Sequence, residues 1–210
     1  MSTYTKLVAD IKDFMEDDGS EFSDAVDTFI DLAELKLSRD LAVPAFRKRQ
    51  TGTLTSSDPF LTLPTDLVTL EYFQLNNSNV RTSLLLKSDE FMQEFWPNRT
   101  STGTPKYYAY FDNSTIYVAP TPSANTPVEI SYRRRLDALS SSNTSNWLTT
   151  DAYDALLYAC LIEASHYNRN DKLLQYHSGL YQKAVQDVNK EGVNRRSLDN
   201  FYMKTEGENG

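Results

Sequence analysis

Three consecutive arginines could bind an anionic partner. Arg133, Arg134 and Arg135 end a segment, residues 127–134, whose alternating apolar side chains predict a β-strand. The planar guanidinium group of arginine can hold a carboxylate through two parallel hydrogen bonds. Side chains alternate along a strand, so Arg133 and Arg135 are expected to point outward together. An unpaired arginine in a core is costly, so the strand is expected to leave the core by Arg134.

Three interpretations of the arginines stay open. They are solvated charges at an exposed strand end, or they bind carboxylates of another chain, or they contact DNA phosphates. The second interpretation makes Arg133, Arg134 and Arg135 residues of a subunit interface.

A series of carboxylates could supply the matching charge. Asp24, Asp27, Asp31 and Glu34 follow one stripe of a predicted helix, away from its apolar stripe. Such a stripe is more typical of a solvated or partner-facing side than of an acid–base pair. Residues 1–40 hold 11 acidic and 4 basic side chains, so the acidic helices of a neighbouring copy are one candidate partner for the arginines.

Catalytic and metal-binding patterns do not emerge. Cys160, Glu163 and His166 are spaced by three, which places the first and third on opposite sides of a helix. A buried thiol and a partly exposed histidine explain them better than a metal site. The sequence has no G-x-S-x-G motif and no phosphate-binding glycine loop. We therefore expect no catalytic residues, no metal, no cofactor and no enzymatic activity.

Composition restricts the function further. The chain has 210 residues and a formal net charge of −8, which argues against a general nucleic-acid binder. Its 13 tyrosines and 10 phenylalanines fit either an interface or a tyrosine-rich β core. One cysteine excludes an intramolecular disulfide. Neither a membrane span nor a signal peptide is recognisable, so a protein made and kept inside a cell, without a membrane partner, is expected.

The periodicity of apolar residues changes twice along the chain. Helical spacing covers residues 3–16 and 20–41, and it returns at 151–167 and 171–191, with Gly192 as the expected C-cap. Between them the period falls to two. The strands are expected at 51–55, 60–63, 67–75, 80–87, 106–111, 115–119 and 127–134, with a short helix at 89–95.

This order predicts an α+β fold in which one helical bundle contains a β insertion. Residues 1–45 and 147–192 are expected to form the bundle. Residues 46–146 are expected to form the inserted antiparallel β lobe. Residues 193–210 have no apolar period and are expected to be a flexible tail.

Three segments resemble the head-to-tail adaptor proteins of short-tailed bacteriophages. They are "LTLPTDLVTLEYFQL" (61–75), "GTPKYYAYFDNSTIYVAPTP" (103–122) and "VEISYRRRLDALSSSNTSNWLTTDAYDALLYACLIEAS" (128–165). The pattern consists of a Gly-x-Pro before aromatic strands, a Pro-x-Pro, a strand ending in Tyr and basic residues, and a Trp-Leu before a helix. The opening helices, with "FIDLAELKLSRDL" (29–41), fit as well. The resemblance covers about residues 5–190 and rests on order and spacing.

The resemblance implies a structural virion protein and its partners. Copies would form a ring, usually dodecameric, beneath the portal, and would provide a surface for the tail or nozzle. Double-stranded DNA would pass through the ring without sequence-specific contact. The protein would lie at the head–tail interface of the virion, after assembly in the host cytoplasm. The C-terminal segment would reach the portal, which assigns portal binding to Arg195, Arg196, Phe201 and Tyr202.

Three rival functions are kept. The first is another ring of the head–tail joint, such as a head-completion or tail-terminator protein. The second is a nucleic-acid-binding module that uses the arginines together with tyrosines as stacking surfaces. The third is a wall-degrading hydrolase carried in the virion, which no residue pattern requires.

Overall fold

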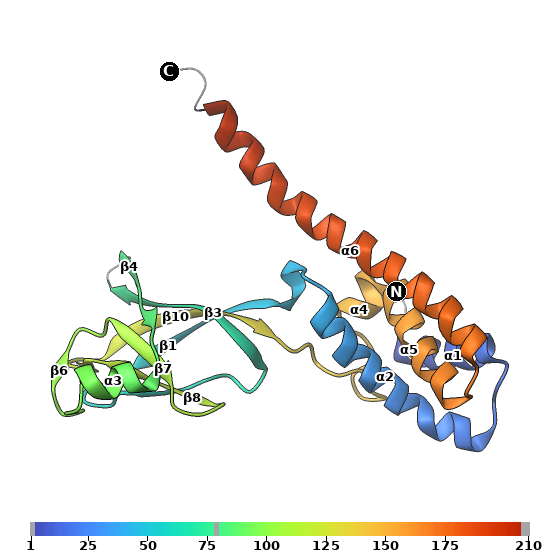
Figure 1. Cartoon of the computed structure of the whole chain (residues 1–210), viewed down its shortest axis with the longest axis horizontal. Coiled ribbons are helices and arrows are strands. Elements are labelled where there is room, and N and C mark those ends of the chain that lie inside the picture. Colours follow the sequence, from blue (N-terminus) through green and yellow to red (C-terminus); the bar gives the residue numbers. More distant parts are fainter. Residues whose placement is uncertain (1–2, 78–79, 207–210) are drawn as a thin grey trace. The chain divides into compact units, whose positions relative to one another are not determined.

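The computed structural model describes the backbone of residues 3–77 and 80–206, and side chains up to residue 192. The chain divides into two compact units, and the fold is α+β, as the sequence predicts. The helical unit comprises residues 1–46 and 136–210, and the β unit comprises residues 47–135. Figure 1 shows both units.

Five α-helices form the helical unit within the described residues. They are α1 (Tyr4–Met15), α2 (Ser20–Asp40), α4 (Trp147–Asp151), α5 (Tyr153–Tyr167) and α6 (Asp171–Glu206), with a short 3-10 helix at Pro44–Phe46. Helix α5 is the centre, because it packs against α1, α2, α4 and α6. Its residues Ala155 to Ser165 are almost all buried, and this explains why its sequence is apolar on several sides.

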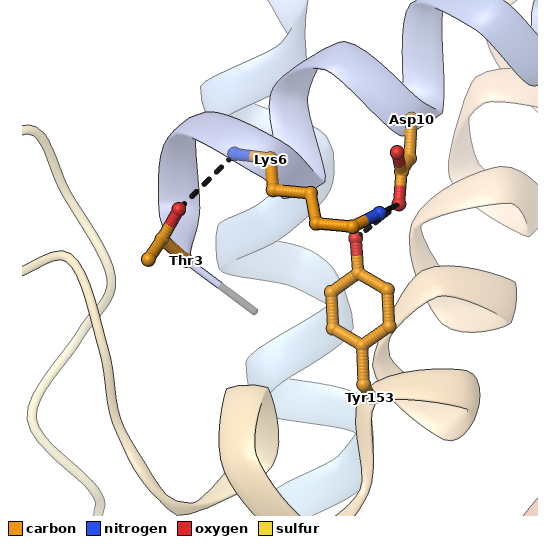
Figure 2. A network of polar contacts seen from close by, with 4 residues as sticks. All are labelled: Thr3, Lys6, Asp10 and Tyr153. Atoms are coloured by element: carbon orange, nitrogen blue, oxygen red, sulfur yellow. Dashed lines mark hydrogen bonds and ion pairs between the residues drawn. The ribbon is translucent and has the colours of Figure 1, made fainter. Parts of the chain in front are cut away.

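Polar side chains attach α1 to this central helix, as Figure 2 shows. The Tyr153 hydroxyl donates a hydrogen bond to Asp10 Oδ2 over 2.5 Å, and Lys6 forms an ion pair with the same carboxylate. Lys6 also lies over the Tyr153 ring, 5.3 Å from its centroid. Thr3 caps the helix by accepting a hydrogen bond from the Lys6 backbone N–H. Helix α1 is therefore held to α5 by charge as well as by apolar packing.

The β unit is built from two four-stranded sheets that share one core. One sheet has the order β1-β10-β3-β4, formed by Arg47–Leu54, Thr126–Arg134, Leu67–Asn77 and Val80–Ser83. The other has the order β2-β8-β7-β5, formed by Phe60–Thr62, Thr115–Ala119, Tyr107–Tyr110 and Leu85–Leu86. Phe73 of β3 meets Tyr108 of β7 edge to face in the shared core, with centroids 5.4 Å apart.

Two shorter elements complete the β unit. Helix α3 (Asp89–Phe95) lies against β7, and Ser88 caps it as a hydrogen-bond acceptor. Strands β6 (Thr102–Gly103) and β9 (Thr121–Pro122) form a separate parallel pair. The pairing of β5 with β7 is also parallel, so the lobe is mainly but not entirely antiparallel.

Among the predicted boundaries that differ from the structure, two concern the helical unit. Residues 136–146 group with the helical unit rather than with the β lobe, because Leu139 is buried in the helical core. Helix α6 continues to Glu206, although we expected it to end near Glu191. Gly192 lowers helix propensity by only about 1 kcal/mol, which does not by itself end a helix. None of the described helices has the length and apolar character to cross a membrane.

Candidate interaction surfaces

The three arginines lie beside a second basic tripeptide that sequence reasoning missed. Strand β1 runs antiparallel to β10, with Arg47 opposite Arg133 and Arg49 opposite Ser131. We call the resulting group the basic strand-end surface; it consists of Arg47, Lys48, Arg49, Arg133, Arg134 and Arg135. The available signal was the basic run 47–49 just before the first predicted strand, since an antiparallel return of residues 127–134 brings the two runs together.

Two carboxylates neutralise part of this surface. Arg47 Nε lies 2.6 Å from Glu71 Oε2, and a second guanidinium nitrogen donates to Glu71 Oε1 over 3.2 Å. Lys48 Nζ lies 2.8 Å from Asp66 Oδ2, while the Tyr132 hydroxyl donates to Asp66 Oδ1 over 2.8 Å. Burial alone would raise the pKa of Asp66, but the hydrogen bonds from Lys48 and Tyr132 outweigh it and lower this pKa.

The other basic residues have different surroundings. Arg49 is exposed and its guanidinium lies over the Tyr72 ring, 5.9 Å from the centroid. Arg133 is half-buried and already has a partner within the protein. Arg135 is exposed, whereas Arg134 is half-buried. The Nε atom of Arg134 is buried without a hydrogen-bond partner among the residues that the structure describes.

The register of β10 explains how Arg134 is accommodated. Its pairing with β3 shifts between Ser131 and Tyr132 and again between Arg133 and Arg134. Such irregularities bend a strand and turn its side chains away from strict alternation. The prediction that the strand leaves the core by Arg134 is only partly met, because Arg134 is half-buried and its Nε is buried. The expected outward position fits Arg135 but only partly fits Arg133.

Three of the four residues in the acidic stripe of α2 are exposed. Asp24, Asp27 and Asp31 are exposed, and the Tyr4 hydroxyl of α1 donates a hydrogen bond to Asp27. This bond, together with burial, raises the pKa of Tyr4 to about 12. Asp24 and Asp31 lie seven residues apart and therefore on the same side of the helix.

Glu34 differs from the predicted stripe because it is an internal anchor. Its carboxylate accepts hydrogen bonds from the Leu139 N–H over 3.2 Å and from Asn146 Nδ2 over 2.7 Å. Burial raises the pKa of Glu34, and these bonds only partly oppose that effect. The geometry points to a role in fixing the loop of residues 136–146 rather than in binding another subunit.

The predicted portal-binding residues lie in the last part of α6. Arg195, Arg196, Phe201 and Tyr202 belong to its helical backbone, but their side chains lie outside the described residues. The helix is attached to the rest of the unit before this part begins. Asn189 accepts a hydrogen bond from the Ala42 N–H over 2.8 Å and donates one to the Asp40 carbonyl over 3.0 Å.

An aromatic surface on the β unit was not predicted as a site. Phe91 stacks on Phe95 with centroids 4.4 Å apart, and Trp96 packs against Tyr107 at 5.4 Å. Lys87 lies 4.8 Å from the centre of the Phe91 ring. Phe95 is 59% exposed, so part of this apolar surface faces solvent. Aromatic residues with exposed rings are frequent at protein interfaces.

Cys160 and His166, considered above as metal ligands, lie in different surroundings. Cys160 is fully buried in the helical core, and burial raises the pKa of its thiol. His166 is exposed near the end of α5. Within the described part of the chain, no three His, Cys, Asp or Glu side chains come together in a way that could hold a metal ion.

Comparison with known proteins gives one family. The sequence model of a family described as SU10 adaptor protein matches residues 2–201, nearly the whole chain. A search of curated proteins gave no match.

Proposed function

The chain belongs to the SU10 adaptor protein family, and from this premise we propose that its copies form a dodecameric ring beneath the portal of a bacteriophage. Members of a head–tail adaptor family are structural proteins of the virion, so a structural role in joining head and tail follows directly from the membership. In the proposed ring, one face meets the portal and the other provides the surface on which the tail or nozzle assembles. Double-stranded DNA passes through the centre without sequence-specific contacts.

The observation that carries this proposal is the extent of the family match. It covers both the helical unit and the inserted β unit, from residue 2 to residue 201. A ring also requires two different surfaces on each copy, because neighbours in a ring meet head to tail. The exposed acidic stripe of α2 and the basic strand-end surface supply two such surfaces with opposite charge.

The C-terminal part of α6 is the proposed contact with the portal. The portion from Arg195 to Tyr202 combines basic and aromatic residues, which are enriched where proteins bind one another. Helix α6 is already anchored to α2 through Asn189, so the following residues extend from a fixed point. An acidic inner surface along which DNA slides is the alternative role for Asp24, Asp27 and Asp31, in place of a subunit contact.

Co-expression with the portal protein of the same phage tests the proposal. We expect electron microscopy to show rings of the protein attached to portals. Removal of residues 193–210 should abolish attachment while leaving the thermal midpoint of the helical unit nearly unchanged, and removal of residues 207–210 alone is the matched control. If the full-length protein does not attach to portals, the proposed position is refuted.

A further inference from the structure

We propose that the basic strand-end surface of one copy binds the Asp24 and Asp31 carboxylates on α2 of a second copy, with strand β1 contributing as much as β10. The inference rests on the proposed ring, whose subunit contact it specifies. It assigns the central role to Arg49 and Arg135, the two exposed arginines of this surface.

The internal partners of the basic strand-end surface show which charges remain to bind a ligand. Glu71 holds Arg47 and Asp66 holds Lys48, at 2.6 and 2.8 Å, while Arg133 has its own partner. Arg49 and Arg135 are exposed. The Arg49 guanidinium lies over the Tyr72 ring, 5.9 Å from its centroid, and such a cation–π contact does not neutralise its charge.

Arg134 contributes charge to the surface, but its Nε is covered by the protein and has no hydrogen-bond partner among the described residues. Buried polar atoms are almost always hydrogen-bonded in folded proteins, and an unpaired one is destabilising. Arg134 is half-buried between Arg133 and the exposed Arg135, at the point where β10 shifts register. Because this Nε is covered, a carboxylate of a second copy would be attracted by the charge of Arg134 rather than bound to that atom.

The spacing of charges matches a helix with carboxylates two turns apart. Arg49 lies opposite Ser131, four positions before Arg135; a fully extended chain would span about 13 Å over these positions, and the register shifts of β10 shorten that span. Asp24 and Asp31 are separated by seven helical residues, or about 10 Å along the helix axis. Arginine side chains are long enough to cover the difference. One exposed face of α2 can therefore reach both ends of the basic strand-end surface.

A protein carboxylate suits this surface better than DNA does. A duplex presents one negative charge per about 1.7 Å, so a bound duplex would also approach the carboxylates of Asp66 and Glu71. Two separate carboxylates on a helix can bind Arg49 and Arg135 without disturbing the ion pairs of Arg47 with Glu71 and of Lys48 with Asp66. The acidic balance of residues 1–40 supplies these carboxylates on every copy.

Charge reversal on each side, followed by a combined reversal, tests the contact. The first variant carries Arg49→Glu and Arg135→Glu, the second carries Asp24→Lys and Asp31→Lys, and the third carries all four changes. We expect the first two to weaken self-association, measured by sedimentation of the full chain, by about 100-fold or more. The third should recover most of the wild-type association, because the charges of every contact are exchanged together.

Controls separate this result from misfolding and from general charge effects. Lys106→Glu with Lys183→Glu makes the same charge change at exposed positions elsewhere and should leave association unchanged. Unfolding curves of every variant check that each unit is folded. Titration with a duplex DNA measures whether Arg49→Glu with Arg135→Glu removes phosphate binding instead.

The possible outcomes distinguish the proposed contact from phosphate binding and from the proposed position below the portal. The proposed contact is overturned if either double variant associates normally. It is also overturned if the variant with all four changes associates as weakly as the two double variants. Loss of DNA affinity without loss of association assigns the surface to phosphate and also overturns it. Wild-type copies that associate through these charges but do not attach to portals would refute the proposed position below the portal and leave the contact intact.

Discussion

At the scale of single residues, hydrogen bonds between tyrosine and aspartate are the recurring device. Each pairs a phenol, which has an apolar ring and a polar end, with a carboxylate from another element. In the part of the chain whose side chains the structure describes, the pairs include Tyr4–Asp27, Tyr117–Asp89, Tyr132–Asp66, Tyr153–Asp10 and Tyr181–Asp40. The high tyrosine content therefore serves the interior contacts of both units, in addition to any interface.

The Tyr153–Asp10 pair gives a prediction on stability and its pH dependence. Tyr153→Phe removes the hydroxyl that binds Asp10, and we expect the free energy of unfolding to fall by about 1.5 kcal/mol, as measured by urea denaturation at pH 7. Tyr176→Phe, at a tyrosine that is 63% exposed, is the control and should have almost no effect. Equal losses in both variants would show that the Tyr153–Asp10 bond contributes nothing specific.

The same pair should also affect acid stability. Burial would raise the pKa of Asp10, but hydrogen bonds from Lys6 and Tyr153 outweigh it, so the folded-state pKa lies below its ordinary value of 3.8. The ionised carboxylate therefore stabilises the fold above pH 3.8, and this contribution disappears as the pH falls through the folded-state value. Tyr153→Phe should lose less stability than the wild type on acidification from pH 5 to pH 3, in the same denaturation assay.

At the scale of elements, the attachment of α6 to the end of α2 determines where the C-terminal part of the helix begins. Asn189 bonds both the Ala42 N–H and the Asp40 carbonyl, and the Tyr181 hydroxyl donates to Asp40 over 2.6 Å. A Cβ atom at Gly192 would lie 3.2 Å from Val43 Cγ1, so the absence of a side chain permits this close approach. The anchored part of α6 thus ends beside residues 40–43.

Removal of the Asn189 side chain tests this attachment. Asn189→Ala loses two hydrogen bonds, and we expect the free energy of unfolding of the helical unit to decrease by about 1–2 kcal/mol, measured by urea denaturation. Lys190→Ala, at the adjacent exposed position, is the control and should change stability by less than about 0.5 kcal/mol. If Asn189 also orients the portal-binding part, Asn189→Ala should weaken attachment to portals; unchanged attachment would contradict that role.

At the scale of the whole molecule, the protein contains separate hydrophobic cores. The core around α5 and the core between the two sheets have no residue in common. The chain passes between the units twice, at residues 46–47 and 135–136. A substitution that disrupts one core should therefore lower the stability of its own unit much more than that of the other unit.

The two tryptophans allow this separation to be measured. Trp147 belongs to the helical unit and Trp96 to the β unit, so replacing either with Phe leaves a reporter for the other unit. Phe73→Ala removes a fully buried ring from the β core and should destabilise that unit by about 3–5 kcal/mol. The denaturation midpoint followed by Trp96 fluorescence should fall much more than the midpoint followed by Trp147. Equal shifts of both midpoints would instead indicate one cooperative unit.

The sequence by itself determined the fold class, the order of elements and the family resemblance. Helical and strand periods are local properties, and the stripe of Phe22, Val26 and Phe29 is buried as its spacing predicts. The alternation in β10 likewise predicted that Val128, Ile130 and Tyr132 share the β core. The periods of helices and strands determine which residues share a face. They do not determine whether the other face is exposed, since Glu129 and Ser131 of β10 are buried too.

Only the tertiary structure decided which distant residues meet. Strand pairing places Arg47 opposite Arg133, and the folding of a loop onto α2 turns Glu34 from an expected surface carboxylate into the acceptor for Leu139 and Asn146. Helix α6 continues through Gly192, and the absence of a side chain there permits the close approach of Val43. Such contacts depend on register and on the approach of segments far apart in the chain, which no local pattern encodes.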